Sequence, residues 1–138
     1  MKIYTGGTFD CFHLGHVEFL RRCDELGEVT VALNTDDFIK RFKGKPPVMN
    51  YIERREVLKA CRYVSRVVTN QRGENSGPTI EAIYPDFIVV GTDWLSKNYL
   101  EQLGIDEEFL WEFGIGLVFI PYTRDISTTE IIRRIKER

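Results

Sequence analysis

Short apolar runs alternate along the chain with longer stretches in which apolar residues recur every three or four positions. The short runs are rich in valine and isoleucine and predict buried strands, whereas the longer stretches predict amphipathic helices. Strands are predicted in five segments, the first beginning at Lys2 and the others lying over 28–34, 64–68, 86–90 and 116–120. Helices are predicted on the apolar positions Val17, Phe19, Leu20 and Leu26, over 51–61, 78–83 and 106–113, and after Ser127 on Ile131, Ile132 and Ile135.

This alternation favours right-handed crossovers and a parallel sheet with helices on both faces. We therefore expect a single α/β domain over residues 1–138, Rossmann-like and doubly wound, with a five-stranded parallel sheet in the order 3-2-1-4-5. In such folds ligands bind beyond the carboxyl ends of the strands. Two loops are predicted at these ends: the basic stretch 40–45, which precedes Pro46 and Pro47, and the polar connection 70–77.

Composition narrows the class of protein. A chain of 138 residues, 43% of them hydrophobic, can bury a core without a disulfide or a metal staple. Its net charge of −2 argues against a nonspecific nucleic-acid coat but is compatible with a local basic pocket for phosphate. The cysteines Cys11, Cys23 and Cys61 are odd in number and lack CxxC spacing, which favours reduced thiols. No apolar run has the length of a signal or transmembrane segment, so we expect a cytoplasmic protein with no membrane insertion.

The segment from Gly6 to His16 carries most of the chemical information. It places two glycines and both histidines of the chain in the turn between the first strand and the first helix. Glycine lets the backbone approach a ligand closely, and the free amides at a helix start bind phosphate. The turn therefore predicts a nucleotide-binding catalytic corner. Cys11 within it is either a reactive thiol or, the commoner case where no base is evident beside it, a packed one.

Two further patterns each leave an alternative open. His13 and His16, close to Asp10, are also compatible with a metal site, although no further Cys or His motif supplies the remaining ligands. Near the other end of the chain, Ser127 and Glu130 have the spacing of a capping box for the final helix. The same hydroxyls and free amides suit phosphate oxygens if this helix begins beside the first one.

Together, GTFDxxHxGH near the start and ISTT near the end resemble the nucleotidyltransferase superfamily, and within it most closely the glycerol-3-phosphate cytidylyltransferases. The resemblance covers most of the chain and includes, between the two motifs, Lys43, Lys45, 51–54, 62–64, 91–94 and Lys97. It implies a reaction in which a phosphate oxygen of the acceptor attacks the α-phosphorus of a nucleoside triphosphate in line and pyrophosphate leaves. Such catalysis rests on positioning and on stabilising the charge that grows on phosphoryl oxygens.

The resemblance also implies a role for each matching residue. His13, His16, Lys45 and Ser127 would be catalytic, the imidazoles binding the triphosphate and stabilising the five-coordinate transition state. The nucleotide would be bound by Gly7, Thr8, Phe9, Asp10, Gly15, Arg62, Asp93, Trp94, Tyr122, Thr123, Arg124, Thr128 and Thr129. Lys43 would contact the acceptor phosphate, with Arg72 as the nearest further cation. Mg²⁺ would be bound through the triphosphate, and the enzyme would be a homodimer with Arg62 near the subunit contact.

Some of these residues also have a plainer interpretation. Lys43 and Lys45 would serve equally as a solvated basic turn, Arg62 as a surface cation at a helix end, and Trp94 as a core residue.

The chain departs from the cytidylyltransferase pattern at several positions. Tyr122 stands where these enzymes have arginine, and Arg124 follows two residues later. Ser76 stands where the glycerol-3-phosphate enzymes place an acceptor-binding lysine. The stretch 97–113 is longer than in compact relatives, and we expect substrate or dimer contacts from it. Residues 40–44 are similar to ATP-using relatives such as heptose-phosphate adenylyltransferases and archaeal FAD synthetases.

Three functions follow from these observations. The leading one transfers CMP from CTP to a small phosphorylated alcohol, with glycerol 3-phosphate as the first expectation, giving CDP-glycerol and pyrophosphate. The alternative transfers AMP from ATP to a sugar phosphate or a flavin-type acceptor. The third is a nucleotide-binding regulatory module without turnover, against which the intact His13, His16, Lys45 and Ser127 argue.

Overall fold

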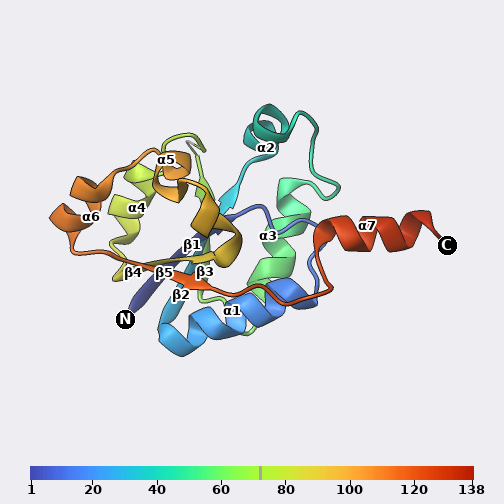
Figure 1. The fold of residues 1–138 in the computed structure, drawn as a ribbon, viewed down its shortest axis with the longest axis horizontal. Coiled ribbons are helices and arrows are strands. Elements are labelled where there is room, and N and C mark those ends of the chain that lie inside the picture. The colour runs from blue at the N-terminus through green and yellow to red at the C-terminus, as the bar shows by residue number, and fades with distance from the viewer. Residues whose placement is uncertain (72) are drawn as a thin grey trace.

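A computed structural model describes residues 1–71 and 73–138, which fold around a parallel sheet (Figure 1). Within these residues the elements are, in order, β1 (Lys2–Gly7), α1 (Leu14–Leu26), β2 (Glu28–Asn34), α2 (Asp36–Lys43), α3 (Tyr51–Ala60), β3 (Arg66–Asn70), α4 (Gly77–Ile83), β4 (Phe87–Gly91), the 3₁₀ turn η1 (Thr92–Ser96), α5 (Tyr99–Leu103), α6 (Glu107–Phe113), β5 (Gly116–Ile120) and α7 (Thr128–Lys136). The strand order is β3-β2-β1-β4-β5, and every neighbouring pair is parallel. The predicted fold class and strand order are confirmed.

The sheet opens between β1 and β4. β1 pairs with β2 along its whole length, but it pairs with β4 only at Ile3 and Tyr4. The chain changes direction across the sheet here, because β2 and β3 lie on one side of β1 while β4 and β5 lie on the other. The crevice at such a switch point is the usual place for a ligand in an open α/β sheet.

Helices cover both faces of the sheet, and each face has its own apolar core. On one face, α1 and α3 pack Leu20 and Leu58 against the strands around Val31. On the other, α4 packs Ile80 against Ile88, and α5 and α6 extend the same core. Each fully buried aliphatic side chain contributes about 1.5–3 kcal/mol. The two cores therefore hold the carboxyl ends of the strands in place from both sides.

α2 corrects one prediction, because a loop was expected over 40–45 and the helix continues through most of it. Its start is capped by Thr35, whose Oγ1 accepts a hydrogen bond of 3.2 Å from the Phe38 amide. Its end is set by Gly44, which has a φ of 79° and donates its N–H to the Lys40 carbonyl at 2.8 Å. Basic residues in a last turn interact favourably with the helix dipole. The positive charges that suggested a loop therefore stabilise a helix end.

The segment after β4 folds into η1, α5 and α6, of which only α6 was predicted. Asp106 caps α6 through its carboxylate, which accepts a hydrogen bond of 2.9 Å from the Phe109 amide. Tyr99 and Leu103 of α5 are buried in the second core. The longer stretch 97–113 thus completes one face of the sheet and brings α5 to the crevice.

The remaining differences between the predicted and the observed elements lie at their ends. β3 begins at Arg66, so Val64, which was predicted to belong to this strand, precedes it. α7 extends away from the sheet (Figure 1) and buries none of its residues. Among the described residues, no helix combines the length and the apolar character that a membrane crossing needs.

Candidate active site

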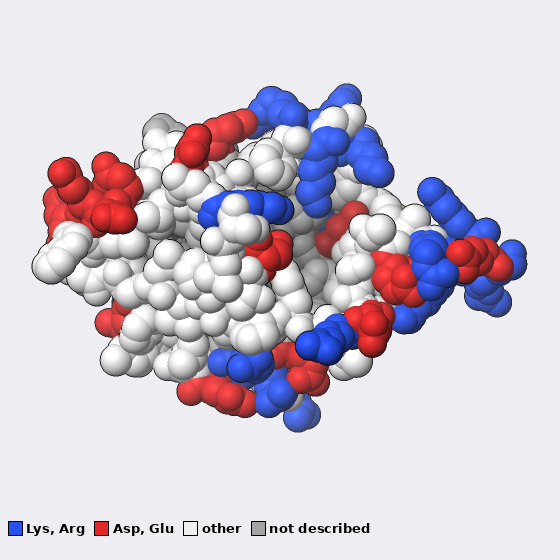
Figure 2. Space-filling view, viewed as in Figure 1, with Lys and Arg blue, Asp and Glu red and all other residues white. Residues whose placement is uncertain are grey.

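A cavity of about 720 Å³ lies at the carboxyl ends of the strands. The last residues of four strands, Gly7, Asn34, Asn70 and Gly91, contribute to its lining. Figure 2 shows a hollow in this face of the molecule, with Lys and Arg side chains gathered over α2 at its edge. A cavity of this size, at the switch point of an open sheet, is the expected place for a ligand.

The starts of α1 and α7 meet at one end of the cavity. The Thr128 hydroxyl donates a hydrogen bond of 2.9 Å to the backbone carbonyl of Asp10, across 118 positions of sequence. A methyl carbon of Ile126 lies 3.4 Å from the position that a Cβ at Gly15 would take. The first amides of each helix have no partner within the helix and suit phosphate oxygens. The structure therefore brings together the two motifs that the sequence placed at opposite ends of the chain.

His13 and His16 form the cap of α1 and fix each other's orientation. Nδ1 of His13 accepts a hydrogen bond of 3.0 Å from the Gly15 amide, and Nδ1 of His16 accepts one of 3.2 Å from the His13 amide. The rings stack with their centroids 3.9 Å apart. Because each Nδ1 is an acceptor, this hydrogen-bond network assigns the proton of each neutral ring to Nε2. Each ring therefore has an Nε2–H left to donate to a ligand.

Both imidazoles are neutral at pH 7. Burial lowers the pKa of His16 to about 3, with a further lowering from His13 that Asp10 partly offsets. Burial also lowers the pKa of His13 below its ordinary value of 6.5. The rings of Phe9 and Phe12 lie 5.2 and 5.4 Å from that of His16 and form much of its apolar surroundings. The pair therefore offers hydrogen-bond donors to a phosphate without bringing positive charge.

Asp10 lines the cavity, but its carboxylate already has partners. It accepts hydrogen bonds of 2.7, 2.9 and 3.1 Å from the amides of Val48, Met49 and Cys11. Burial raises the pKa of the Cys11 thiol, and the Asp10 charge raises it further. These contacts favour the packed-thiol interpretation of Cys11, because little thiolate forms near neutral pH.

Arg54 of α3 is the buried link between three segments of the site, and sequence reasoning gave it no role of its own. Its guanidinium donates to the backbone carbonyls of Thr8, Asn34 and Met49 at 2.9 to 3.0 Å and pairs with the Asp36 carboxylate at 2.7 Å. Its side chain is 0% exposed. Arg54 therefore holds the turn after β1 in register with the end of β2.

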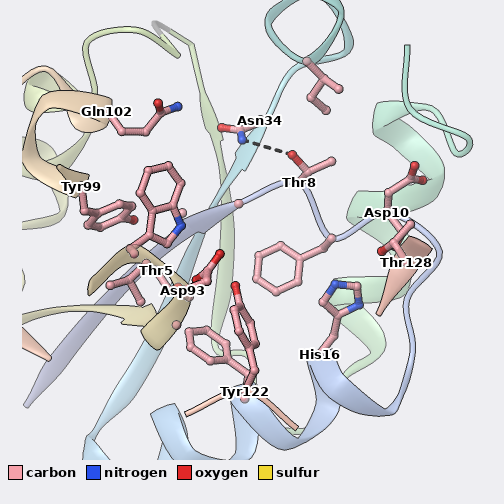
Figure 3. Close-up of a pocket in the computed structure, with 18 of the residues that line it drawn as sticks. Thr5, Thr8, Asp10, His16, Asn34, Asp93, Tyr99, Gln102, Tyr122 and Thr128 are labelled. Carbon is pink, nitrogen blue, oxygen red and sulfur yellow. Dashed lines mark hydrogen bonds between the residues drawn. The ribbon is translucent and has the colours of Figure 1, made fainter. Parts of the chain in front are cut away.

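Asp93 and Tyr122 lie next to each other, on the opposite side of the cavity from His16 (Figure 3). The Tyr122 ring lies on Gly91, where a Cβ would come within 2.5 Å of it. Burial, together with the facing Asp93 carboxylate, raises the pKa of Tyr122 to about 12. The ammonium group of Lys97 lies 5.2 Å from the centre of the Trp94 ring, within range of a cation–π interaction.

The remaining wall of the cavity is largely apolar, and most of it was not predicted. It includes Phe38 and Phe42 of α2, whose rings lie 5.7 Å apart, and Tyr99 and Leu103 of α5. Figure 3 shows Tyr99 and Gln102 on the side of the cavity away from His16 and Thr128. The cavity thus has an end lined by the starts of α1 and α7, whose amides and imidazoles suit phosphate, and a more apolar end between α2 and α5.

A family model described as "cytidylyltransferase-like" matches residues 4–134. The chain belongs to this family. Members of the nucleotidyltransferase superfamily are enzymes, and the relatives of this chain carry enzyme names.

The relatives of this chain are of two kinds. One kind matches it over nearly the whole of its own length, and the other over about a third. The "FAD synthase" of Pyrococcus horikoshii is 38% identical over 99% of this chain and 93% of its own length. The "ethanolamine-phosphate cytidylyltransferase" of Arabidopsis thaliana is 36% identical over 96% of this chain and 32% of its own length. The crystal structure of a lipopolysaccharide core biosynthesis protein from Thermoplasma volcanium, 24% identical, shares the fold with a TM-score of 0.70 over 89% of this chain and 96% of its own.

Most residues singled out by the family resemblance line the cavity. They are Gly7, Thr8, Phe9, Asp10, His13, Gly15, His16, Lys43, Asp93, Trp94, Tyr122, Thr123, Ser127 and Thr128. Their shared position is a finding of the structure, and their individual roles remain predictions.

Four predicted residues lie outside the cavity, and a fifth lies outside the described residues. Lys45 is exposed just after α2, Arg124 is exposed in the segment before α7, and Thr129 is exposed in the first turn of that helix. Arg62 lines a separate shallow depression between α1 and α3. Arg72 is the position that the structure does not describe.

The predicted capping box at α7 forms only in one direction. Ser127 Oγ accepts a hydrogen bond of 3.0 Å from the Glu130 amide. The Glu130 carboxylate does not return the bond, because it pairs with Arg133 and Arg134. The Ser127 amide is therefore left for another acceptor, such as a phosphate oxygen.

Proposed function

We propose that the chain is an adenylyltransferase of the FAD-synthase kind, which transfers AMP from ATP to the phosphate of FMN and releases pyrophosphate. The observation that carries this proposal is the apolar end of the cavity, between α2 and α5. A flavin ring is flat and apolar on both faces, and it suits a wall that contains Phe38, Phe42 and Leu103. Glycerol phosphate would leave that wall uncovered.

The relatives support the same choice of substrate. Two FAD synthases of Pyrococcus, 36% and 38% identical, match this chain over 93% of their own length. The ethanolamine-phosphate cytidylyltransferases share only about a third of their own length with it, at 32% and 36% coverage. The FAD synthases therefore match this chain over nearly their whole length, whereas the cytidylyltransferases are longer proteins of which this chain matches about a third.

The reaction is an in-line transfer at phosphorus. An oxygen of the FMN phosphate forms a bond to the α-phosphorus of ATP, the bond from that phosphorus to the bridging oxygen breaks, and the electron pair leaves with pyrophosphate. Nε2–H of His13 and of His16 donate to the phosphoryl oxygens on which charge grows, and the amides at the starts of α1 and α7 hold the phosphates. These donors are already oriented in the absence of ligand, so little reorganisation is needed.

The ATP would bind as its Mg²⁺ complex, with the ion held mainly by triphosphate oxygens, where it neutralises their charge. In the described part of the chain, no three His, Cys, Asp or Glu side chains gather in a way that could hold a metal ion.

Cytidylyl transfer from CTP to a small phosphorylated polyol, glycerol 3-phosphate first among them, remains the second candidate. The family's description and the ethanolamine-phosphate relatives favour it. Tyr122 argues for ATP, because cytidylyltransferases place an arginine at this position and Arg124 is exposed outside the cavity. A homodimer in the cytoplasm stays part of the proposal, and sedimentation of the purified protein tests the dimer.

Pyrophosphate release with ATP, CTP, GTP and UTP, each against FMN, glycerol 3-phosphate, ethanolamine phosphate and a heptose phosphate, tests the function. We expect turnover with ATP and FMN, with FAD as the product identified by its absorbance and mass. Turnover selective for CTP and a polyol phosphate would replace the first proposal by the second. Binding of a nucleotide without turnover of any acceptor would favour the regulatory module.

A further inference from the structure

Tyr4, Asn70 and Ser76 form a buried polar cluster at the floor of the cavity. They are 0%, 3% and 0% exposed, and all three belong to the cavity lining. Tyr4 is the last residue of β1 that pairs with β4, so it lies where the two strands part. Asn70 ends β3, and Ser76 precedes α4. The reaction proposed above assigns none of them a role.

The carboxamide of Asn70 leaves its oxygen without a partner among the described residues. Its Nδ2 donates to Asn34 Oδ1 at 3.1 Å and to Ser76 Oγ at 3.3 Å. In the same hydrogen-bond network, Asn34 Nδ2 donates to Thr8 Oγ1 at 3.3 Å. Turning over the Asn70 amide alone would set its Oδ1 against the side-chain oxygen Oδ1 of Asn34. The unused group is therefore a hydrogen-bond acceptor.

The Tyr4 hydroxyl is the second unpartnered group within the described residues. Burial raises the pKa of Tyr4 to about 12, an effect that the nearby Ser76 side chain partly offsets, so the hydroxyl keeps its proton and can donate. A Cβ at Gly6 would lie 3.0 Å from this oxygen. A side chain at this position would crowd the hydroxyl, and both Gly6 and Tyr4 belong to the cavity lining.

A buried polar atom without a partner is costly, and such atoms are rare in native proteins. Here a free acceptor and a free donor both belong to residues next to Ser76, at the floor of one cavity. A ring N–H with a ring carbonyl next to it would satisfy both groups at once. That pair occurs on the imide edge of a flavin ring, and it is absent from glycerol phosphate and sugar phosphates.

We propose that Asn70 Oδ1 and the Tyr4 hydroxyl recognise the imide edge of the acceptor ring, Asn70 accepting from the ring N–H and Tyr4 donating to the adjacent carbonyl. The inference rests on the proposed function and names the residues that determine its acceptor. Phe38 packs against Gly73 on the wall above, where a Cβ would come within 2.2 Å of its ring. The apolar wall would pack against the faces of the ring, while Asn70 and Tyr4 at the floor form hydrogen bonds with its edge.

The test compares FMN with 3-methyl-FMN, in which a methyl group replaces the hydrogen of the imide nitrogen. For the wild-type enzyme with ATP, kcat/KM should fall at least about 30-fold with the methylated acceptor, since a site built to hydrogen-bond a donor rejects an analogue that lacks it. For Asn70→Ala, the kcat/KM for FMN should exceed that for 3-methyl-FMN by only about 3-fold or less. Equal use of both acceptors by the wild-type enzyme overturns the inference.

Tyr4→Phe supplies a variant that is not expected to disturb the fold, because it removes only the unpartnered hydroxyl. Its KM for FMN should rise about 10-fold with an unchanged KM for ATP, while its melting temperature in the absence of ligand stays the same or rises. Tyr84→Phe, at a tyrosine that is 62% exposed, is the matched control and should change neither. A lower melting temperature for Tyr4→Phe with an unchanged KM for FMN would mean that a structural water satisfies the hydroxyl, and would also overturn the inference.

Quenching of flavin fluorescence separates this inference from the proposed function. If the wild type binds FMN, and the variants Tyr4→Phe and Asn70→Ala bind it equally tightly, only the proposed recognition of the imide edge fails. If FMN neither binds to any form of the protein nor turns over with ATP, both the inference and the proposed acceptor fail.

Discussion

The hydroxyl of Thr128 donates a hydrogen bond of 2.9 Å to the backbone carbonyl of Asp10. This contact joins the start of α7 to the turn before α1, and both segments line the same end of the cavity. None of the residues of α7 is fully buried, so its start is held by contacts at the surface of the domain. The position of the start of α7 therefore depends on this hydrogen bond together with the packing of Ile126 beside Gly15.

Thr128→Val should weaken this junction, because valine has the same shape but no hydroxyl. We expect the free energy of unfolding to fall by about 1 kcal/mol, the usual net value of one hydrogen bond, and the KM for the nucleotide to rise roughly 10-fold. Urea unfolding and initial-rate kinetics measure the two effects. Thr128→Ser keeps the hydroxyl and should stay close to wild type. An unchanged nucleotide KM in the valine variant would show that the junction does not position the phosphates.

His13→Asn separates the structural role of the histidine from its chemical role. Asparagine is a good N-cap, and its side-chain oxygen can accept from the Gly15 amide as Nδ1 does now. It cannot supply the Nε2–H that we assign to phosphoryl oxygens. We expect the free energy of unfolding to change by less than about 0.5 kcal/mol and kcat to fall at least about 100-fold, as on loss of one transition-state donor. Wild-type turnover with an intact fold would remove His13 from the mechanism.

The buried His16 makes stability depend on pH. Its pKa is about 3 in the folded protein against an ordinary 6.5, so between these values the unfolded chain binds a proton that the folded chain does not. The stability from the neutral ring is complete above pH 6.5 and is lost as the pH falls toward 3, at no more than about 1.4 kcal/mol per pH unit. Urea titrations of wild type and His16→Gln between pH 5 and 7.5 should give a shallower slope for the variant.

Nitrogen NMR provides the direct check on the same residue. At pH 5 we expect His16 to remain neutral with its proton on Nε2, whereas an ordinary histidine would be largely protonated. A protonated His16 at pH 5 in the folded protein would contradict the effect of burial on its pKa and the acceptor role of its Nδ1 toward the His13 amide.

The strands were predictable because buried parallel strands appear in the sequence as continuous apolar runs, as in β2. α2 was missed because its apolar residues Phe38, Ile39 and Phe42 are few and its last turn is basic, while the caps at Thr35 and Gly44 that define it each depend on a single residue. α5 has five residues, too few for its periodicity to show. Helices set by their caps and by tertiary packing leave little pattern in the sequence.

The site residues that belong to a sequence motif could be predicted. Those brought together only by the pairing of strands could not. His13, His16 and Ser127 belong to motifs, and all line the cavity. Asn34 and Asn70 meet because β2 and β3 pair in a register that sets these two residues opposite each other. No spacing along the chain indicates that register, so the polar floor of the cavity could be found only from the structure.

The role of Arg54 likewise could not be predicted from the sequence. On a helix with several charged residues it cannot be told from its exposed neighbour Arg55 by sequence pattern, since its acceptors come from three separate segments. Arg54→Met would leave carbonyls of Thr8, Asn34 and Met49 without their donor in a buried site. We expect a loss of about 3 kcal/mol or more in the free energy of unfolding, and a similar loss for Arg54→Lys, because one ammonium group cannot reach acceptors spread around a planar guanidinium. Arg55→Met, at a side chain that is 39% exposed, should change the stability by less than about 0.5 kcal/mol. Equal unfolding midpoints in urea for the two methionine variants would contradict the role of Arg54 as the link between the three segments.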